Sequence, residues 1–317
     1  MKIAFLRRDS TFVRALTERL EPELAHHDYF LWETGDPAPA SDLDMLLVAG
    51  DVGRELLASQ PRLSFVQTVT AGYEGVDVDA ASDLGIWVSS APSGETGNAV
   101  SVAEFAVFLM IGASRNVLAE PMMHISPSLF GKSVCIVGLG SIGRLIVDRL
   151  QPFAMQIIAV DDRPERARTG VVVYRRNRIR DAIRNADYVV VCATGTKENE
   201  NLIDAGALAA MKRGAIVVNV SRGLLVDEDA LAAAVAGGHI AAAGLDVLKK
   251  EPPESSNPLL ALPQIFVTPH IAGVTDMMLD GTVSYLARVV ADVDAGCKPA
   301  ATLNSPGRPR RVLIAAA

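Results

Sequence analysis

Three residue types that can do chemistry follow apolar runs in the second half of this sequence. Arg222 comes soon after AIVVN, Glu251 follows GLDVLKK, and His270 follows IFVTP. A guanidinium binds a carboxylate through two parallel hydrogen bonds, and an imidazole changes its charge near neutral pH. His270 is one of five histidines in 317 residues. A single histidine among apolar residues more often packs in a core than transfers protons, so the surrounding elements must decide its role.

A glycine-rich turn precedes these residues in the chain. The segment GLGSIG begins at Gly138 and lies between the strand-like run SVCIV and a helical pattern. In such a turn Gly138 allows the tight bend, Gly140 lets the backbone approach a pyrophosphate, and Gly143 lets the helix pack close to the strand. The backbone N–H groups of Ser141 and Ile142 would hold the phosphates at the helix start. This arrangement predicts a dinucleotide-binding site.

An acidic residue at the end of the next strand would indicate which dinucleotide binds. The apolar run QIIAV is followed directly by Asp161 and Asp162. A carboxylate at this place accepts a hydrogen bond from the ribose 2′-hydroxyl and repels a 2′-phosphate. We expect Asp161 at the ribose, which favours NAD. Arg163 is close enough in the sequence to keep NADP as the less favoured alternative.

Short apolar runs alternate with helical patterns along most of the chain, which predicts parallel sheets. Before residue 98 the expected strands are residues 2–6, 44–49, 64–69 and 86–90. After residue 131 they are residues 133–137, 156–160, 171–173, 188–192, 215–219, 241–247 and 265–267. In an open parallel sheet, ligands bind beyond the carboxyl ends of the strands. Arg222, Glu251 and His270 are therefore expected in three successive loops at one edge.

Composition excludes several function classes. Half of the residues are hydrophobic, so the chain can form a sizeable core, and the net charge of −7 disfavours nucleic acid or an anionic membrane surface as a partner. Cys135, Cys192 and Cys297 lie far apart, which predicts neither a disulfide framework nor a metal site. With no signal peptide and no apolar segment of about 20 residues, we expect a soluble cytoplasmic protein. The arginine-rich residues 163–184 are interpreted as a solvated face.

A long apolar helix and a proline-containing segment divide the chain. Residues 98–115 are apolar nearly all round, residues 120–128 contain two prolines, and a last helix is expected at residues 276–295. We predict an α/β protein with two parallel-sheet domains, Rossmann-like or flavodoxin-like, separated by an active-site cleft. The expected domains are a substrate domain, residues 1–98 plus 280–317, and an NAD-binding Rossmann domain, residues 99–279.

Six motifs make the sequence similar to the NAD-dependent D-isomer-specific 2-hydroxyacid dehydrogenases, a family that includes glyoxylate/hydroxypyruvate reductases. They span most of the chain in the family's order: TAGYEGVDVDAA, NAVSVAE, GKSVCIVGLGSIG, MKRGAIVVNVSRGLLVDEDAL, GLDV followed by EP, and VTPHIAG. The resemblance implies hydride transfer between NAD(H) and a small 2-oxo acid or D-2-hydroxy acid. It also implies a homodimer.

The resemblance assigns roles to individual residues. Arg222 would bind the substrate carboxylate, His270 would donate and accept the proton, and Glu251 would hold His270 by a hydrogen bond. Ala71 and Gly72 would offer backbone groups to the substrate. At the cofactor, Asp246 would contact the nicotinamide carboxamide, and the remaining implied residues are Val102, Cys192, Ala193, Thr194, Val220, Ser221 and Gly273, with Arg222 and His270 adjoining.

The sequence also departs from the family. Cys192 and Thr194 replace a usual His and Pro, which alters the adenine pocket, and residues 116–130 lack a Trp-containing segment that often helps to build the dimer. The side-chain pocket is expected to take a small or modestly apolar group and has no dedicated phosphate clamp, which disfavours 3-phosphoglycerate. Two other functions stay open: an NAD-sensing, corepressor-like interaction protein, and a hydride enzyme on another small anion such as formate or phosphite.

Overall fold

The computed structural model describes residues 1–117 and 125–315, and the chain forms two compact units. Unit 1 comprises Met1–Asn98 and Val274–Ala317, and unit 2 comprises Ala99–Gly273. The return to unit 1 thus lies at Val274, six residues before the predicted position 280. Residues 120–124 of the predicted joint at 120–128, and residues 118–124 of segment 116–130, fall outside the described residues.

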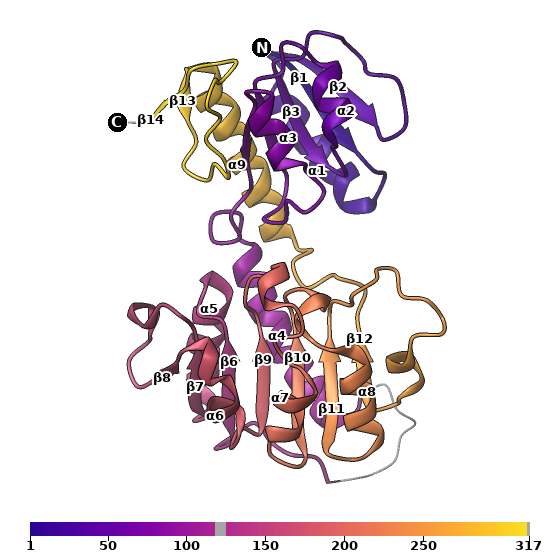
Figure 1. Cartoon of the computed structure of the whole chain (residues 1–317), viewed down its shortest axis with the longest axis vertical. Coiled ribbons are helices and arrows are strands. Elements are labelled where there is room, and N and C mark those ends of the chain that lie inside the picture. Colours follow the sequence, from indigo (N-terminus) through magenta and orange to yellow (C-terminus); the bar gives the residue numbers. More distant parts are fainter. Residues whose placement is uncertain (118–124, 316–317) are drawn as a thin grey trace. The chain divides into compact units, whose positions relative to one another are not determined.

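Unit 1 is built on a five-stranded parallel sheet with the strand order β2-β1-β3-β4-β5. This order is the flavodoxin-like one, in which the chain reverses direction across the sheet between β1 and β3. Helices cover both faces of the sheet (Figure 1). The elements are β1 Lys2–Arg7, α1 Thr11–Glu23, β2 Asp28–Glu33, β3 Met45–Ala49, α2 Arg54–Ser59, β4 Phe65–Thr68, α3 Val78–Asp83, β5 Trp87–Ser89, α9 Asp276–Asp294, β13 Cys297–Lys298 and β14 Ile314–Ala315.

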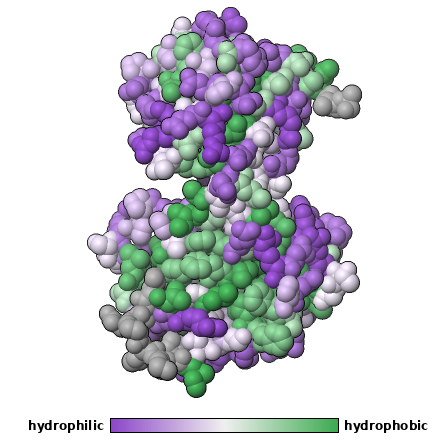
Figure 2. All heavy atoms as spheres, turned by 180° about the vertical axis from the view of Figure 1, so that it is seen from behind, coloured by the Kyte–Doolittle hydropathy of each residue, from purple (hydrophilic) through white to green (hydrophobic). Residues whose placement is uncertain are grey.

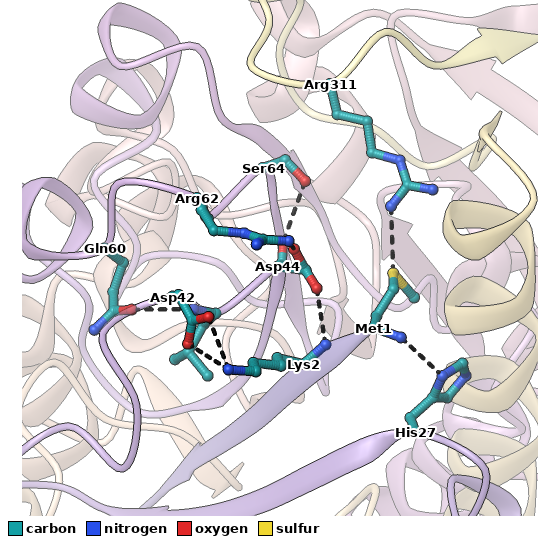
Figure 3. A network of polar contacts seen from close by, with 10 residues as sticks. Met1, Lys2, His27, Asp42, Asp44, Gln60, Arg62, Ser64 and Arg311 are labelled. Carbon is teal, nitrogen blue, oxygen red and sulfur yellow. Dashed lines mark hydrogen bonds and ion pairs between the residues drawn. The ribbon is translucent and has the colours of Figure 1, made fainter.

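A polar network ties together the amino ends of this sheet (Figure 3). Lys2 Nζ forms an ion pair of 2.7 Å with Asp42, and the Lys2 backbone N–H donates to Asp44 Oδ2 at 2.9 Å. Arg62 donates to the other Asp44 oxygen at 3.0 Å. Since ligands of parallel sheets bind at the opposite, carboxyl edge, we assign this network to the stability of unit 1.

Unit 2 has a seven-stranded parallel sheet with the order β12-β11-β10-β9-β6-β7-β8. This is the Rossmann order, and its reversal point lies between β6 and β9. The elements are α4 Asn98–Arg115, β6 Ser133–Val137, α5 Ser141–Leu150, β7 Gln156–Val160, β8 Val172–Tyr174, α6 Ile179–Ile183, β9 Tyr188–Val191, α7 Ala205–Ala210, β10 Ala215–Asn219, α8 Glu228–Ala236, β11 Ile240–Leu245 and β12 Ile265–Val267. The prediction of two parallel-sheet α/β domains is confirmed.

Helix α4 packs tightly on one face of this sheet. A Cβ atom added at Gly244 of β11 would lie 3.0 Å from Leu109, and one at Gly112 would lie 2.8 Å from the Phe266 ring. The helix is long and apolar enough to cross a membrane by composition, but 56% of it is buried inside the protein. Its apolar character therefore serves the core of unit 2.

Strands β2, β13 and β14 and helix α3 of unit 1 were not predicted. Strand β2 has the sequence DYFLWE, and Trp32 is its one buried residue, so it lacks the continuous apolar run of a central strand. Helix α3 is six residues long, which is too short to display a helical period.

Candidate active site

The glycine-rich turn has the geometry that close phosphate approach requires. Gly138 has φ +106°, and a Cβ atom there would lie 2.7 Å from Ala193 N, while one at Gly143 would lie 1.9 Å from Gly138 O. Gly140 caps the N-terminus of α5, and nothing lies within 4 Å of the place where its Cβ would be. Gly138 and Gly143 thus permit close packing of the backbone on itself. Gly140 leaves open the space that a Cβ atom would occupy. Ser141 and Ile142 begin α5, where backbone N–H groups attract anions.

Asp161 lies directly beside this turn. One carboxylate oxygen accepts from Leu139 N at 2.8 Å, and the other accepts from Arg163 N at 2.8 Å. The side chain is only 10% exposed. Because each oxygen has two lone pairs, the carboxylate can still accept from a ribose hydroxyl. The residues present therefore fit a nicotinamide dinucleotide.

A cavity of about 290 Å³ opens at the reversal point of the unit 2 sheet. Six of the predicted cofactor residues line it: Gly138, Gly140, Asp161, Cys192, Ala193 and Thr194. Cys192 donates a hydrogen bond from Sγ to Gly138 O at 3.1 Å, which joins the end of β9 to the glycine turn. Burial raises the pKa of the Cys192 thiol, so this residue stays protonated and serves as a donor.

Several lining residues were not predicted, and the arginines of the cavity, of which Arg163 was expected near the cofactor, change one interpretation. Arg163, Arg166 and Arg176 line the same cavity, together with Asp162, Thr196, Glu198, Asn199 and Leu202. The interpretation of residues 163–184 as a solvated face was incomplete. It holds for Arg168, which pairs with Asp148, and for Arg178, which pairs with Asp181. For Arg163, Arg166 and Arg176, the feature of the sequence that could have indicated a place at the cavity is that they follow the ends of strands.

The other predicted cofactor residues lie elsewhere in unit 2. Val102 is in α4 and 6% exposed within the core, and Val220 and Ser221 follow β10. Ser221 Oγ donates to Ala193 O, so the loops after β9 and β10 are joined. Gly273 is the last residue of unit 2.

His270 and Glu251 form a hydrogen-bonded pair. His270 Nδ1 lies 2.7 Å from Glu251 Oε2, and the other oxygen of Glu251 accepts from Leu248 N at 2.9 Å. The hydrogen bond to Glu251 raises the pKa of His270 above its ordinary value of 6.5, against the opposing effect of burial. Burial works to raise the pKa of Glu251, but its hydrogen bonds with His270 and Leu248 outweigh burial and hold that pKa below its ordinary value. The pair therefore favours a protonated imidazole and an ionised carboxylate.

The loop that carries His270 is held in an uncommon conformation by Asp246. His270 has φ +55°, in the left-handed region that few non-glycine residues adopt, and its N–H donates to Asp246 O at 2.9 Å. The carboxylate of Asp246, 2% exposed, accepts hydrogen bonds from Thr268 Oγ1, Ile271 N and Ala272 N at 2.7–2.9 Å. Such strain persists only where surrounding contacts enforce it, and it is concentrated at functional sites. Asp246 therefore positions His270, a role that the sequence did not predict.

Arg222 lies close to this pair. Its Nη1 donates to Ser221 O at 2.9 Å, and its charge opposes the raised pKa of His270 and helps to lower the pKa of Glu251. Asn219 shapes the turn, since its Nδ2 donates to Arg222 O at 2.9 Å. Arg222 thus acts electrostatically on the Glu251–His270 pair within unit 2, although 48 residues separate Arg222 from His270.

Glu228 holds the segment that carries Glu251. Its carboxylate accepts from Lys249 N at 2.5 Å and from Asn257 Nδ2 at 3.0 Å. The sequence alone shows Glu228 only as an acidic residue in the first turn of a helix. Ala71 and Gly72, the predicted substrate-binding residues, follow β4 in unit 1 and are half-buried.

Comparison with known proteins identifies the family. Residues 112–272 match the family model described as D-isomer specific 2-hydroxyacid dehydrogenase, NAD binding domain. A glyoxylate reductase of Aeropyrum pernix is 30% identical over 298 residues, which cover 85% of this chain and 88% of the relative. The chain belongs to the D-isomer-specific 2-hydroxyacid dehydrogenase family. Unit 2 is the family's NAD-binding domain, which confirms the predicted cofactor.

Two further family members extend the comparison. D-3-phosphoglycerate dehydrogenase of Mycobacterium tuberculosis is 40% identical over 250 residues, 75% of this chain but 47% of the relative. The chain thus spans about half the length of that relative. The structure of a glyoxylate reductase from Paecilomyes thermophila superposes with a TM-score of 0.79 at 26% identity, covering 95% of this chain and 98% of the other.

Proposed function

We propose that the protein is an NAD-dependent oxidoreductase that interconverts a 2-oxo acid and its D-2-hydroxy acid. The observation that carries the proposal is the 2.7 Å contact between His270 and Glu251, a pair whose pKa values the charge of Arg222 also affects. These groups belong to the same unit as the cofactor cavity. The predicted roles of Ala71 and Gly72 at the substrate rest on the family resemblance, and the cytoplasmic location stays a proposal from the sequence.

In the proposed mechanism, Arg222 binds the carboxylate of the 2-oxo acid and fixes its orientation. His270 donates its proton to the carbonyl oxygen during reduction and recovers it from the hydroxyl during oxidation. Because Glu251 engages Nδ1, Nε2 is the ring nitrogen left to exchange the proton with the substrate. Asp246 and Thr268 keep the imidazole in place. The cofactor, when bound, supplies or accepts the hydride.

The first test is NADH oxidation with glyoxylate, hydroxypyruvate and pyruvate, followed by the His270→Ala variant. We expect turnover to fall at least ~10²-fold, because a positioned general acid contributes about that much, while NADH binding is retained. His239→Ala is the matched control, since the His239 ring contacts Leu208 O in the same unit rather than Glu251. Unchanged turnover in His270→Ala would remove His270 from its role. Binding of NADH with no turnover of any 2-oxo acid would favour the interaction protein or a formate or phosphite enzyme instead.

A specific substrate, 3-phosphoglycerate, is the second candidate. The 40% identity with the mycobacterial phosphoglycerate dehydrogenase favours it. The test is oxidation of D-3-phosphoglycerate with NAD⁺, compared with oxidation of unphosphorylated D-2-hydroxy acids.

We propose further that the protein acts as a homodimer through the outer face of α4. Hydrophobic side chains gather on the side of unit 2 seen in Figure 2. Phe108, Ile111 and Val117 are 47%, 37% and 52% exposed. Large exposed apolar patches mark interfaces. The Phe108→Glu variant should sediment as a monomer where the parent protein sediments as a dimer, and a monomeric parent protein would disprove the proposal.

A further inference from the structure

A second cavity lies wholly within unit 1, at the carboxyl ends of its parallel strands. Its volume is about 270 Å³. The ends of β3 and β4, the first turn of α1 and the loop after β4 form its walls. The hydrophobic residues of these walls are Phe12, Val13, Val48, Ala49, Val69 and Val76. Tyr73, which is 42% exposed, also lines the cavity.

The position of this cavity is that of a ligand site. It lies beside β3, next to the point where the strand order reverses between β1 and β3, and open parallel sheets bind ligands at such points. The loop after β4 contributes Gly72, one of the two residues predicted to bind the substrate. Pockets for whole ligands usually measure about 300–1,000 Å³, so this cavity suits one part of a ligand.

The cavity has no counter-charge for an anion. None of the described residues that line it is charged. Arg8 lies near its edge, since a Cβ atom at Gly50 would be 3.9 Å from Arg8 Cγ, but the Arg8 guanidinium pairs with Asp51. At the start of α1, Ser10 caps the helix and Asp9 precedes it in the chain. Burying a phosphate here without a cation would be strongly unfavourable.

We propose that this cavity receives the side chain of the substrate, and that the preferred substrate is a 2-oxo acid with an uncharged aliphatic or aromatic side chain. This inference rests on the proposed function and sets the protein apart from a phosphoglycerate dehydrogenase. The apolar walls recognise the side chain by excluding water from it. Ala71 and Gly72 stand at the adjoining loop, where the carboxylate would lie in such a substrate.

The test compares kcat/KM, with NADH, for 4-methyl-2-oxopentanoate, phenylpyruvate, glyoxylate and 3-phosphohydroxypyruvate. We expect one of the first two to exceed the last two by at least about 10-fold, because a single methylene group in an apolar pocket changes specificity by roughly 10–200-fold. The highest kcat/KM with 3-phosphohydroxypyruvate or with glyoxylate would overturn the inference.

A matched pair of variants tests whether this cavity determines the preference for an apolar side chain. Ala49→Leu fills part of the cavity, and the ratio of kcat/KM for the branched acid to that for glyoxylate should fall by at least about 10-fold. Ala58→Leu adds the same group on the exposed face of α2, outside the cavity, and should leave this ratio within about 2-fold of the parent value. Equal ratios in the two variants would exclude the cavity as the side-chain site.

Calorimetric titration of the same acids into the NAD⁺-loaded protein separates the inference from the proposed function. Tightest binding of the aliphatic or aromatic acid supports the inference whether or not it is turned over. Binding without turnover would overturn only the proposed function. If neither apolar acid binds, the inference is wrong.

Discussion

At the scale of residues, the candidate site depends on how three side chains are held. The His270 imidazole faces Glu251, and its backbone is fixed by Asp246, whose buried carboxylate takes three hydrogen bonds from one short loop. A carboxylate beside an imidazole stabilises the imidazolium ion. The charge state that reduction requires is therefore favoured before any substrate arrives.

The first prediction at this scale concerns pH. Reduction needs protonated His270, so kcat/KM should fall as pH rises through the pKa of His270, which lies above 6.5 because of Glu251. In Glu251→Gln the neutral amide removes the raising effect, and the fall should occur at lower pH. Oxidation needs neutral His270 and should show the opposite dependence. The pH profiles of the parent protein and of Glu251→Gln, measured in both directions, check this, and coincident profiles would contradict the role of Glu251.

At the scale of elements, the cofactor cavity is formed by loops that follow neighbouring strands of the sheet. The glycine turn before α5, the end of β7 and the end of β9 come together because β6 pairs with both β7 and β9. Asp161 and the three arginines that line the cavity have opposite effects on a 2′-phosphate. The negative charge lies nearest the turn, since Asp161 accepts a hydrogen bond from Leu139 N.

This balance leads to a prediction about cofactor choice. Asp161→Asn keeps the size and an acceptor oxygen but removes the repulsion, so the ratio of kcat/KM with NADPH to that with NADH should rise at least about 10-fold, equivalent to about 1.4 kcal/mol. Adding Arg166→Ala to this variant should lower the gain, because Arg166 lines the same cavity. An unchanged ratio in Asp161→Asn would place the ribose elsewhere.

A second prediction at this scale tests the glycine turn. Gly143→Val should abolish measurable NADH binding, because even its Cβ would lie 1.9 Å from Gly138 O. Gly214→Val, at a turn of the same unit with open space around it, is the control for a glycine outside the cofactor loop, although its φ of +83° adds strain of about 1–3 kcal/mol. Fluorescence titration of NADH measures both variants, and tight binding by Gly143→Val would contradict the packing argument.

At the scale of the whole molecule, the two units have separate hydrophobic cores. The core clusters of unit 1 contain residues of unit 1 only, and those of unit 2 contain residues of unit 2 only. Both tryptophans of the chain, Trp32 and Trp87, belong to unit 1. Tryptophan fluorescence therefore reports on unit 1, while circular dichroism reports on both units.

This difference permits a prediction about stability. NAD⁺ at about 100 times its Kd should stabilise unit 2 by about 2.7 kcal/mol. In a urea titration, the midpoint seen by circular dichroism should rise, while the midpoint seen by tryptophan fluorescence should stay the same. Equal shifts in both signals would mean that the chain unfolds as a single cooperative unit.

The sequence was sufficient for the features that depend on local patterns. Continuous apolar runs predicted the central strands, and residues 98–115 predicted α4 with its observed bounds, because buried elements repeat apolar residues along the chain. The glycine spacing predicted the cofactor turn, and strand ends predicted which loops carry Arg222, Glu251 and His270. The exposed edge strand β2, the short α3 and the two-residue strands β13 and β14 lacked such patterns and were missed.

Contacts between distant segments were decided only by the tertiary structure. These include the three hydrogen bonds that the Asp246 carboxylate accepts and the hydrogen bond from Lys249 N to Glu228. They also include the arginines that line the cofactor cavity, and the apolar cavity of unit 1. The physical reason is that a local pattern fixes which face of an element is buried. Which side chains then share a cavity depends on strand order, loop path and backbone dihedrals such as the positive φ of His270.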